Sequence, residues 1–368
     1  MLKPKTRQSS NPNLYHLTPA GLTARRGTNK KPKSMRKYGN RTIAIGPWLL
    51  AAGLVLAAGC TGVTPEETTP RQELMLKPSA VATKADPELA GTTLGTDNSY
   101  VVYLSASCAQ VPTFMSGQLY SYISTNTKWE ASSAVGTADP IYWPLGGERL
   151  DFLGIACTPV AYSELAPSWD AVTPADRVTI SGWDTYAKQY DVMYAVANNQ
   201  TAGTNAGVVD MSFRHTMAVV GFTAVSDIED AVTLNKITIN GLGYSGDLVI
   251  DNSHTEVTAV WSTLASADKV VPGTGGETAD YAFAVPTSAA QCARHLLVPQ
   301  QAARTVTLSY TMKDAVTALD YTLVLPRTVW KAGYKYVYAI RFSPTEITAT
   351  PTVTAWDGSE VDIVFDDI

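Results

Sequence analysis

Val232-Thr233-Leu234-Asn235-Lys236-Ile237-Thr238-Ile239-Asn240 carries the clearest structural pattern in this chain of 368 residues. Apolar and polar side chains alternate through most of it. A period of two residues is typical of a β-strand with one face in a core and the other in water. Gly241, Gly243 and Gly246 follow, and Asp247 to Ile250 resumes the pattern, so we expect a hairpin here.

Similar runs occur on both sides of this strand, whereas helical periodicity is hard to find. They are rich in Val, Ile, Thr, Tyr and Phe, and Gly, Pro, Asn or Asp separates them. They cover Tyr100 to Ser105, Val208 to Phe213, Ala218 to Ala224, Ala282 to Val285, Thr305 to Met312, Tyr321 to Leu325, Tyr334 to Phe342 and Ile347 to Val353. The sequence therefore predicts an all-β protein built from β-sandwiches.

A polar segment of small residues divides these runs at residues 198–207. Its sequence, Asn-Asn-Gln-Thr-Ala-Gly-Thr-Asn-Ala-Gly, is typical of a flexible connection. We therefore expect an N-terminal domain over residues 74–205 and a C-terminal domain over residues 206–368. Both are of ordinary size for a domain with its own core.

An export signal is predicted ahead of these domains. Residues 35–60 read MRKYGNRTIAIGPWLLAAGLVLAAGC, which is a basic head, an uncharged apolar segment and three small residues before Cys60. A transmembrane helix is the alternative, since residues 42–65 are about as long as the roughly 20 residues that cross a bilayer. Pro47 weakens that alternative, and the small residues favour cleavage before a lipidated Cys60.

The predicted signal region is residues 1–59, with Met35 as a candidate translation start. Residues 60–73 are mainly Thr, Pro and Glu, so we expect a flexible tether that carries a lipid such as palmitate on Cys60. The folded part would then lie outside the cell, anchored at the outer membrane through this lipid.

Charge separates the signal region from the rest of the chain. Of the 28 Lys and Arg, eleven precede Cys60, whereas all 33 Asp and Glu follow it, so the exported part carries 17 − 33 = −16. A surface this acidic repels nucleic acid, and its partners should be proteins, sugars or cations. Cys108 and Cys157 could form a disulfide, or these two and Cys292 could be buried free thiols.

Several short motifs follow one another along residues 80–356. They are Tyr142-Trp143-Pro144, Leu150-Asp151-Phe152, Gln189 to Ala195, Val209 to Ala218, Leu234 to Gly246, Leu297 to Gln300, Trp330 to Tyr336 and Val353 to Trp356. In this order they resemble the fimbrillin-like family of Bacteroidales surface pilins and related lipoproteins. The resemblance implies two tandem transthyretin-like β-sandwich domains. It also implies a cell-surface fimbrial subunit or a fimbria-associated adhesin.

The resemblance further implies assembly by strand donation, with other fimbrial subunits as partners. In polymerising members a protease removes the first strand of the N-terminal domain, and an extended segment of a neighbouring subunit fills the groove. The candidate donor strand is residues 359–368, in which Val361, Ile363 and Phe365 would project from one face. Alternatively, this segment is simply the last strand of its own domain.

Arg71, Lys77 and Lys84 are the candidates for the protease cut. Lys84 matches the family's usual arginine in position and charge but not in residue type. A protease specific for arginine would find Arg71, and cleavage there would leave residues 74–82 in place. The sequence therefore leaves two roles open: a subunit that polymerises into a stalk, or a tip, anchor or accessory subunit.

Trp129, Trp169 and Trp183 lie in polar, loop-rich sequence and are candidates for an adhesive surface, because aromatic faces stack on sugar rings. They support a second hypothesis. In it, the protein is a monomeric, lipid-anchored module of the outer membrane that binds a host or bacterial glycan or protein.

No catalytic residue, metal site or cofactor is predicted, and the protein is not expected to be an enzyme. His215, His254 and His295 have no second ligand at metal-binding spacing. His215 lies in an apolar, strand-like run, so we expect a structural histidine that is hydrogen-bonded near the domain junction. Asp210 and Ser212 are its neighbours along the strand and do not indicate a catalytic triad.

Overall fold

The computed structural model describes residues 71–80, 94–274, 281–301, 305–326 and 329–356. Nearly all regular structure in these ranges is β-strand, which confirms the predicted fold class. One short helix, α1 (Pro159–Leu165), and one 3-10 turn, η1 (Thr204–Gly207), interrupt the strands of the described ranges. None of these described helices is long and apolar enough to span a bilayer. The tandem transthyretin-like arrangement stays a prediction.

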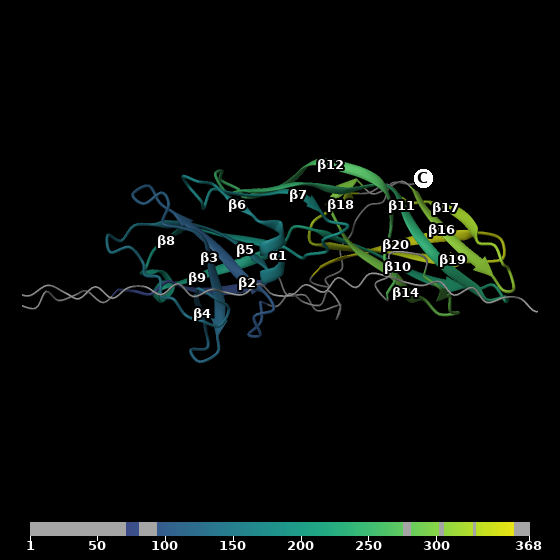
Figure 1. Ribbon diagram of the computed structural model, residues 1–368, viewed down its shortest axis with the longest axis horizontal. Helices are drawn as coiled ribbons and strands as arrows, with labels where there is room; N and C mark the ends of the chain where they lie inside the picture. Colours follow the sequence, from purple (N-terminus) through teal and green to yellow (C-terminus); the bar gives the residue numbers. More distant parts are fainter. Residues whose placement is uncertain (1–70, 81–93, 275–280, 302–304, 327–328, 357–368) are drawn as a thin grey trace, which may run out of the picture. The chain divides into compact units, whose positions relative to one another are not determined.

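The first sheet closes on itself in the order β1-β4-β3-β2-β5-β8-β9, with β1 between β9 and β4. Figure 1 labels β2, β3, β4, β5, β8 and β9 of this sheet. Its strands are β1 (Met75–Ala80), β2 (Val101–Ser107), β3 (Met115–Ile123), β4 (Lys128–Ala131), β5 (Leu150–Cys157), β8 (Met193–Gln200) and β9 (Val208–His215). Leu104, Phe152 and Phe213 are fully buried in its hydrophobic cluster. β5 also buries Leu153 and Ile155 in a second cluster, so both of its faces are covered.

Two further sheets share a hydrophobic cluster of their own. One has the order β14-β10-β19-β20, and the other has the order β17-β16-β11-β7-β6 with β12 and β13 also paired to β11. The strands of the first of these are β14 (Ala290–Leu297), β10 (Ala218–Ser226), β19 (Tyr334–Phe342) and β20 (Ile347–Ala355). Those of the second are β17 (Leu319–Val324), β16 (Thr305–Met312), β11 (Val232–Asp251), β7 (Arg177–Asp184), β6 (Ser168–Trp169), β12 (Thr258–Val270) and β13 (Phe283–Ala284). A small pair joins β15 (Gln300–Gln301) to β18 (Val329–Trp330).

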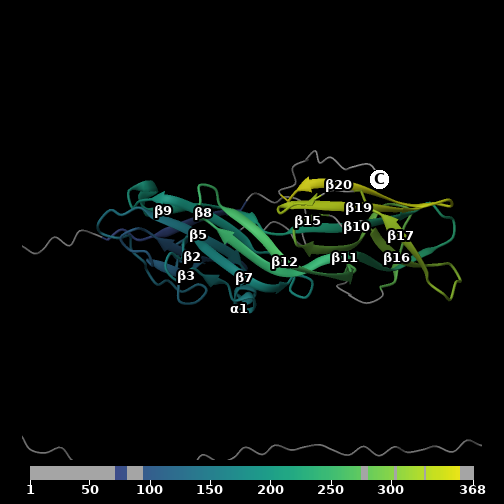
Figure 2. The same cartoon turned by 90° about the horizontal axis from the view of Figure 1, so that it is seen from above.

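β11 continues as one strand of 20 residues, so the hairpin expected around Gly241 to Gly246 is wrong. The register between β11 and β12 shifts between Ile239 and Leu242 and again after Gly243. Gly241 has a φ of +66°, which glycine adopts without the steric cost of a side chain. β-Bulges at the glycines therefore absorb the irregularity without ending the strand. The chain turns back after Asp251, and β12 returns beside β11 (Figure 2).

β11 contributes to two hydrophobic clusters. Ile237 and Ile239 lie in the cluster shared with β10 and β19, whereas Leu248 and Ile250 lie in the cluster that includes Ile155 of β5. β9 falls within the range expected for the second domain, yet it pairs with β1 and β8 in the first sheet. The domain boundary at residues 205–206 stays a prediction.

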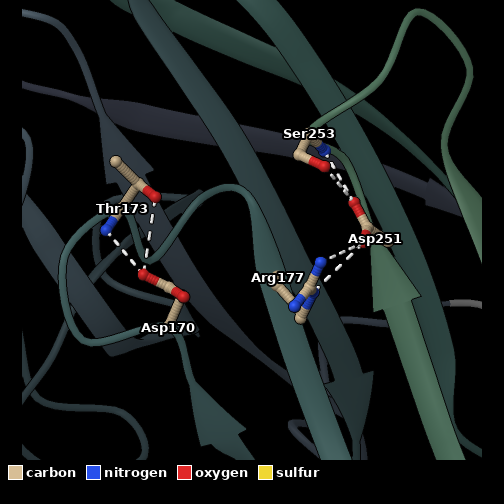
Figure 3. A network of polar contacts seen from close by, with 5 residues as sticks. All are labelled: Asp170, Thr173, Arg177, Asp251 and Ser253. Carbon is tan, nitrogen blue, oxygen red and sulfur yellow. Dashed lines mark hydrogen bonds and ion pairs between the residues drawn. The ribbon is translucent and has the colours of Figure 1, made fainter.

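Polar contacts fix the end of the β7–β11 pair, where Arg177 and Asp251 are direct cross-strand partners (Figure 3). Arg177 donates from Nη2 and Nε to Asp251 Oδ2 at 2.7 and 3.1 Å. Ser253 donates to the other carboxylate oxygen from its hydroxyl and its backbone N–H. The hydroxyl of Ser253, its N–H and the guanidinium of Arg177 together lower the pKa of Asp251 to about 2. Beside this network, Asp170 accepts the N–H of Thr173 at 2.9 Å and so closes the turn before β7.

Candidate functional site

β1 is the strand that closes the first sheet. It pairs in parallel with β9 over six residues, from Met75 opposite Val208 to Ala80 opposite Phe213. Its pairing with β4 is limited, within the described ranges, to Leu76 opposite Trp129. A parallel ladder is slightly less stable per residue than an antiparallel one. β1 is therefore held mainly along one edge, and by the weaker kind of ladder.

The side chains of β1 divide into a buried and an exposed set. Leu74, just before the strand, and Leu76 are 0% and 4% exposed and lie in the same cluster as Phe213. Each contributes roughly 1.5–3 kcal/mol through burial. Lys77 points to solvent, 3.5 Å from the carboxylate of Asp210, and such exposed pairs contribute at most about 1 kcal/mol. Apolar packing is thus the main force that holds β1.

Two features weaken the fit of β1 in its position. Pro78 lies opposite Met211 and has no N–H, so it cannot donate a hydrogen bond to the ladder. In addition, a cavity of about 370 Å³ lies beside the strand, lined by residues 75–78 of β1, residues 127–129 and Val208. β1 therefore leaves part of the space next to it unfilled.

The segment ahead of β1 is held by backbone hydrogen bonds. Leu74 N donates to Ile141 O at 2.8 Å, and Trp143 N donates to Gln72 O at 2.9 Å. The indole of Trp143 donates to Gly207 O at 3.0 Å. Gly207 has a φ of +83°, and a Cβ there would lie 2.7 Å from the side chain of Gln72. A glycine is therefore required where this segment crosses the start of β9.

Glu73 lies in this segment in an unfavourable electrostatic environment. Burial raises the pKa of its carboxyl, the nearby Glu130 raises it further, and Lys128 opposes both effects. The ionised form of Glu73 is therefore disfavoured when β1 is in place.

The predicted cleavage and anchoring residues fall partly within the described ranges. Arg71 is exposed at the first described position, and Lys77 is exposed in β1. The remaining predicted residues lie outside the described ranges: Cys60, Lys84, Val361, Ile363 and Phe365. Their roles stay predictions.

The tryptophans predicted to form an adhesive surface are placed differently from one another. Trp183 is 1% exposed and Trp129 is 7% exposed, so the prediction that these two form a surface is wrong. Trp183 packs at 5.2 Å from the ring of Trp261, and Trp129 packs in the cluster that β1 covers. Trp169 is half-buried and donates its N–H to Tyr162 Oη at 3.0 Å. Cross-strand packing buries these side chains, which the polar sequence around them does not reveal.

His215 has the surroundings expected of a structural histidine. Its Nδ1 lies 2.9 Å from Asp191 Oδ1, and its ring stacks on Trp356 with the ring centres 3.8 Å apart. In the described part of the chain, no group of three or more side chains could hold a metal ion. Cys108, Cys157 and Cys292 are free thiols, and burial raises the pKa of the latter two to about 12.

These observations define an all-β protein whose first sheet is closed by a weakly held strand. The sequence profile of the fimbrillin-like family matches residues 83–356, and the chain therefore belongs to this family. It is thus a fimbrial protein of the cell surface. A search of curated proteins found no relative.

Two solved structures show a similar fold. A fimbrial protein of Bacteroides vulgatus superposes with a TM-score of 0.54 at 13% identity, over 77% of this chain and 99% of the other. A candidate cell adhesion protein of Bacteroides uniformis superposes with a TM-score of 0.50 at 15% identity, over 78% of this chain and 99% of the other. At these identities the likeness concerns the fold.

Proposed function

We propose that this protein is a fimbrial subunit that assembles by strand exchange at the position of β1. The observation that carries the proposal is the way β1 closes the first sheet, with six residue pairs to β9 against one described pair to β4. Removing this strand would open the sheet between β9 and β4. It would also uncover the apolar cluster that Leu74 and Leu76 now cover.

An opened sheet of this kind favours a replacement strand. The exposed edge of β9 would present unpaired N–H and C=O groups beside an apolar groove, and a donated strand satisfies both. The cavity beside β1 leaves room for larger side chains than those present now. The opened subunit is therefore expected to bind a strand more tightly than it bound β1.

We propose residues 359–368 of a neighbouring copy as the donated strand. Val361, Ile363 and Phe365 recur at every second position, as Leu74 and Leu76 do, so they would enter the same groove. Burial of three such side chains contributes roughly 1.5–3 kcal/mol each before the cost of ordering the strand.

Cleavage after Lys84 would detach the whole of β1, whereas cleavage after Arg71 would leave it in place. We therefore propose Lys84 as the activating cut and Cys60 as the lipid anchor of the uncut precursor. Mass spectrometry of the amino-terminal peptide from cells tests both. A lipidated Cys60 in the precursor and a new terminus after Lys84 in assembled material are expected. A terminus after Arg71 in assembled material would contradict removal of β1.

A disulfide between β1 and β9 gives the sharper test of strand exchange. Ser79 and Ser212 are direct partners in the ladder and both are exposed, and neighbouring strands are about 5 Å apart, which suits a disulfide. Ser79→Cys and Ser212→Cys would be combined in a Cys108→Ser background, which removes the half-buried thiol.

The oxidised double variant should retain β1 after proteolysis and stay monomeric, whereas the reduced protein should polymerise. The length of the assembled polymers would be measured by size-exclusion chromatography and electron microscopy. Ser79→Cys alone, in the same background, should polymerise with or without oxidant. If the oxidised double variant polymerised as well as the reduced one, strand exchange at β1 would be excluded.

A further inference from the structure

A second cavity, of about 340 Å³, lies away from β1, where β8 and β9 approach the β19–β20 pair. Tyr194 of β8 and Arg214 of β9 line one side of it, and Tyr334 of β19 and Trp356 line another. Its volume is within the range of about 300–1,000 Å³ that is usual for small-molecule sites.

Backbone pairing fixes the side chains on both sides of this cavity. Tyr194 and Arg214 are direct cross-strand partners, so their side chains emerge on the same face. On the other side, Trp356 N donates to Gly333 O at 2.7 Å, and Gly333 N donates to Met217 O at 2.9 Å. The cavity is therefore built from ladder positions and short hydrogen-bonded turns rather than from long loops.

Trp356 is held in place by His215, which also lines the cavity. The rings of Trp356 and His215 stack face to face, with their planes nearly parallel at an angle of 3° and their centres 3.8 Å apart. His215 is fixed in turn by Asp191, whose carboxylate is 5% exposed and occupied by this contact. This contact between two lining residues, supported by the buried Asp191, keeps the cavity wall in one conformation.

The side chains that line the cavity offer hydrogen-bond donors that are not in use. In the described part of the chain, the guanidinium of Arg214, the hydroxyls of Tyr194 and Tyr334 and the indole N–H of Trp356 have no hydrogen bond or ion pair. Arg214 is also exposed, in a protein whose exported part carries a net charge of −16. An unpaired arginine beside three neutral donors favours a ligand that is anionic and rich in acceptor oxygens.

We propose that this cavity binds a carboxylated sugar, of the uronic-acid or sialic-acid type. A planar guanidinium matches a carboxylate in a two-pronged hydrogen bond, which a neutral sugar cannot make. The ring hydroxyls would accept hydrogen bonds from the tyrosine hydroxyls and the indole N–H, and the tyrosine rings offer apolar faces to the sugar ring. This ligand site is independent of strand exchange at β1.

Nuclear magnetic resonance titration of the full-length protein would test the proposal. The probes are methyl β-D-glucuronide, its neutral counterpart methyl β-D-glucoside, and acetate. The glucuronide should bind with a dissociation constant in the millimolar range and shift the Trp356 indole signal, which Trp356→Phe identifies. The glucoside and acetate should each bind at least about tenfold more weakly, because each lacks one half of the recognised chemistry.

Arg214→Gln should weaken glucuronide binding by about tenfold or more, and Tyr194→Phe by a few-fold. Arg149→Gln is the matched control, because Arg149 is exposed and does not line the cavity. An unchanged amide spectrum would show that each variant is folded. Equal affinity for the glucuronide and the glucoside, an unaffected Arg214→Gln variant, or no shift of the indole signal would each overturn the proposal. So would acetate binding as tightly as the glucuronide, since a carboxylate alone would then suffice.

Discussion

Asp251 shows how a single carboxylate holds two strands in register. Its two oxygens are divided between Arg177, across the ladder, and Ser253, in the turn that follows β11. The side chain of Asp251 is 14% exposed and that of Arg177 is 50% exposed, so solvent screens the pair in part. The hydrogen bonds to the charged form account for most of what this contact contributes.

Asp251→Asn should lower the free energy of unfolding by about 1 kcal/mol at pH 7. The folded-state pKa of Asp251, about 2, is below its usual value of 3.8. The stabilisation of the fold by ionised Asp251 is therefore present above about pH 4 and is lost as the pH falls toward 2. Urea unfolding at several pH values should show the variant and the parent converging in acid. Asp230→Asn is the control, since Asp230 is exposed. A difference in the free energy of unfolding between Asp251→Asn and the parent that persisted unchanged at pH 2 would contradict this account.

At the scale of the element, β1 explains why one strand can be replaced without destroying the fold. It has few buried side chains, a proline within its ladder and a cavity beside it. The local polarity pattern does not predict it as a strand, because Leu74-Met75-Leu76 is an unbroken apolar run and Pro78 is unusual in a strand; only the family resemblance implied a first strand here. Its parallel pairing with β9, more than a hundred residues away, makes it a strand.

Glu73→Gln should stabilise the folded protein with β1 in place at neutral pH. The folded-state pKa of Glu73 is raised, so its ionised form costs stability once the pH rises above the ordinary range near 4. The variant should be more stable than the parent by a few tenths of a kcal/mol at pH 7, since the site is largely solvated, and equal to it below about pH 4. Urea unfolding at both pH values measures this, with the exposed Glu346→Gln as the control. A less stable variant at pH 7 would show that the carboxylate is favourable there.

At the scale of the whole molecule, β11 joins packing regions that the sequence suggests are separate. Ile237 lies in one hydrophobic cluster and Ile250 in another, on one uninterrupted strand. Two clusters that share a strand cannot lose their packing independently unless that strand breaks.

We therefore expect one cooperative thermal transition rather than two. Ile237→Ala and Ile250→Ala should each lower the free energy of unfolding by about 2–4 kcal/mol, and both should lower the same transition temperature. Differential scanning calorimetry measures this. Val316→Ala, at a fully exposed position, should leave the transition unchanged. Two resolved transitions, each shifted by one of the isoleucine variants, would show two independent domains instead.

The local pattern of the sequence was sufficient to predict the all-β class. The alternation in Val232–Asn240 and in the similar runs of this chain reflects burial of one face of each strand. The family could also be inferred from the order of its motifs. Long-range contacts determined the strand order, since no local signal encodes which distant edge a strand joins. Packing between sheets buried Trp129 and Trp183 and continued β11 through its glycines. The same long-range contacts brought Arg214, Tyr194, Tyr334 and Trp356 around one cavity.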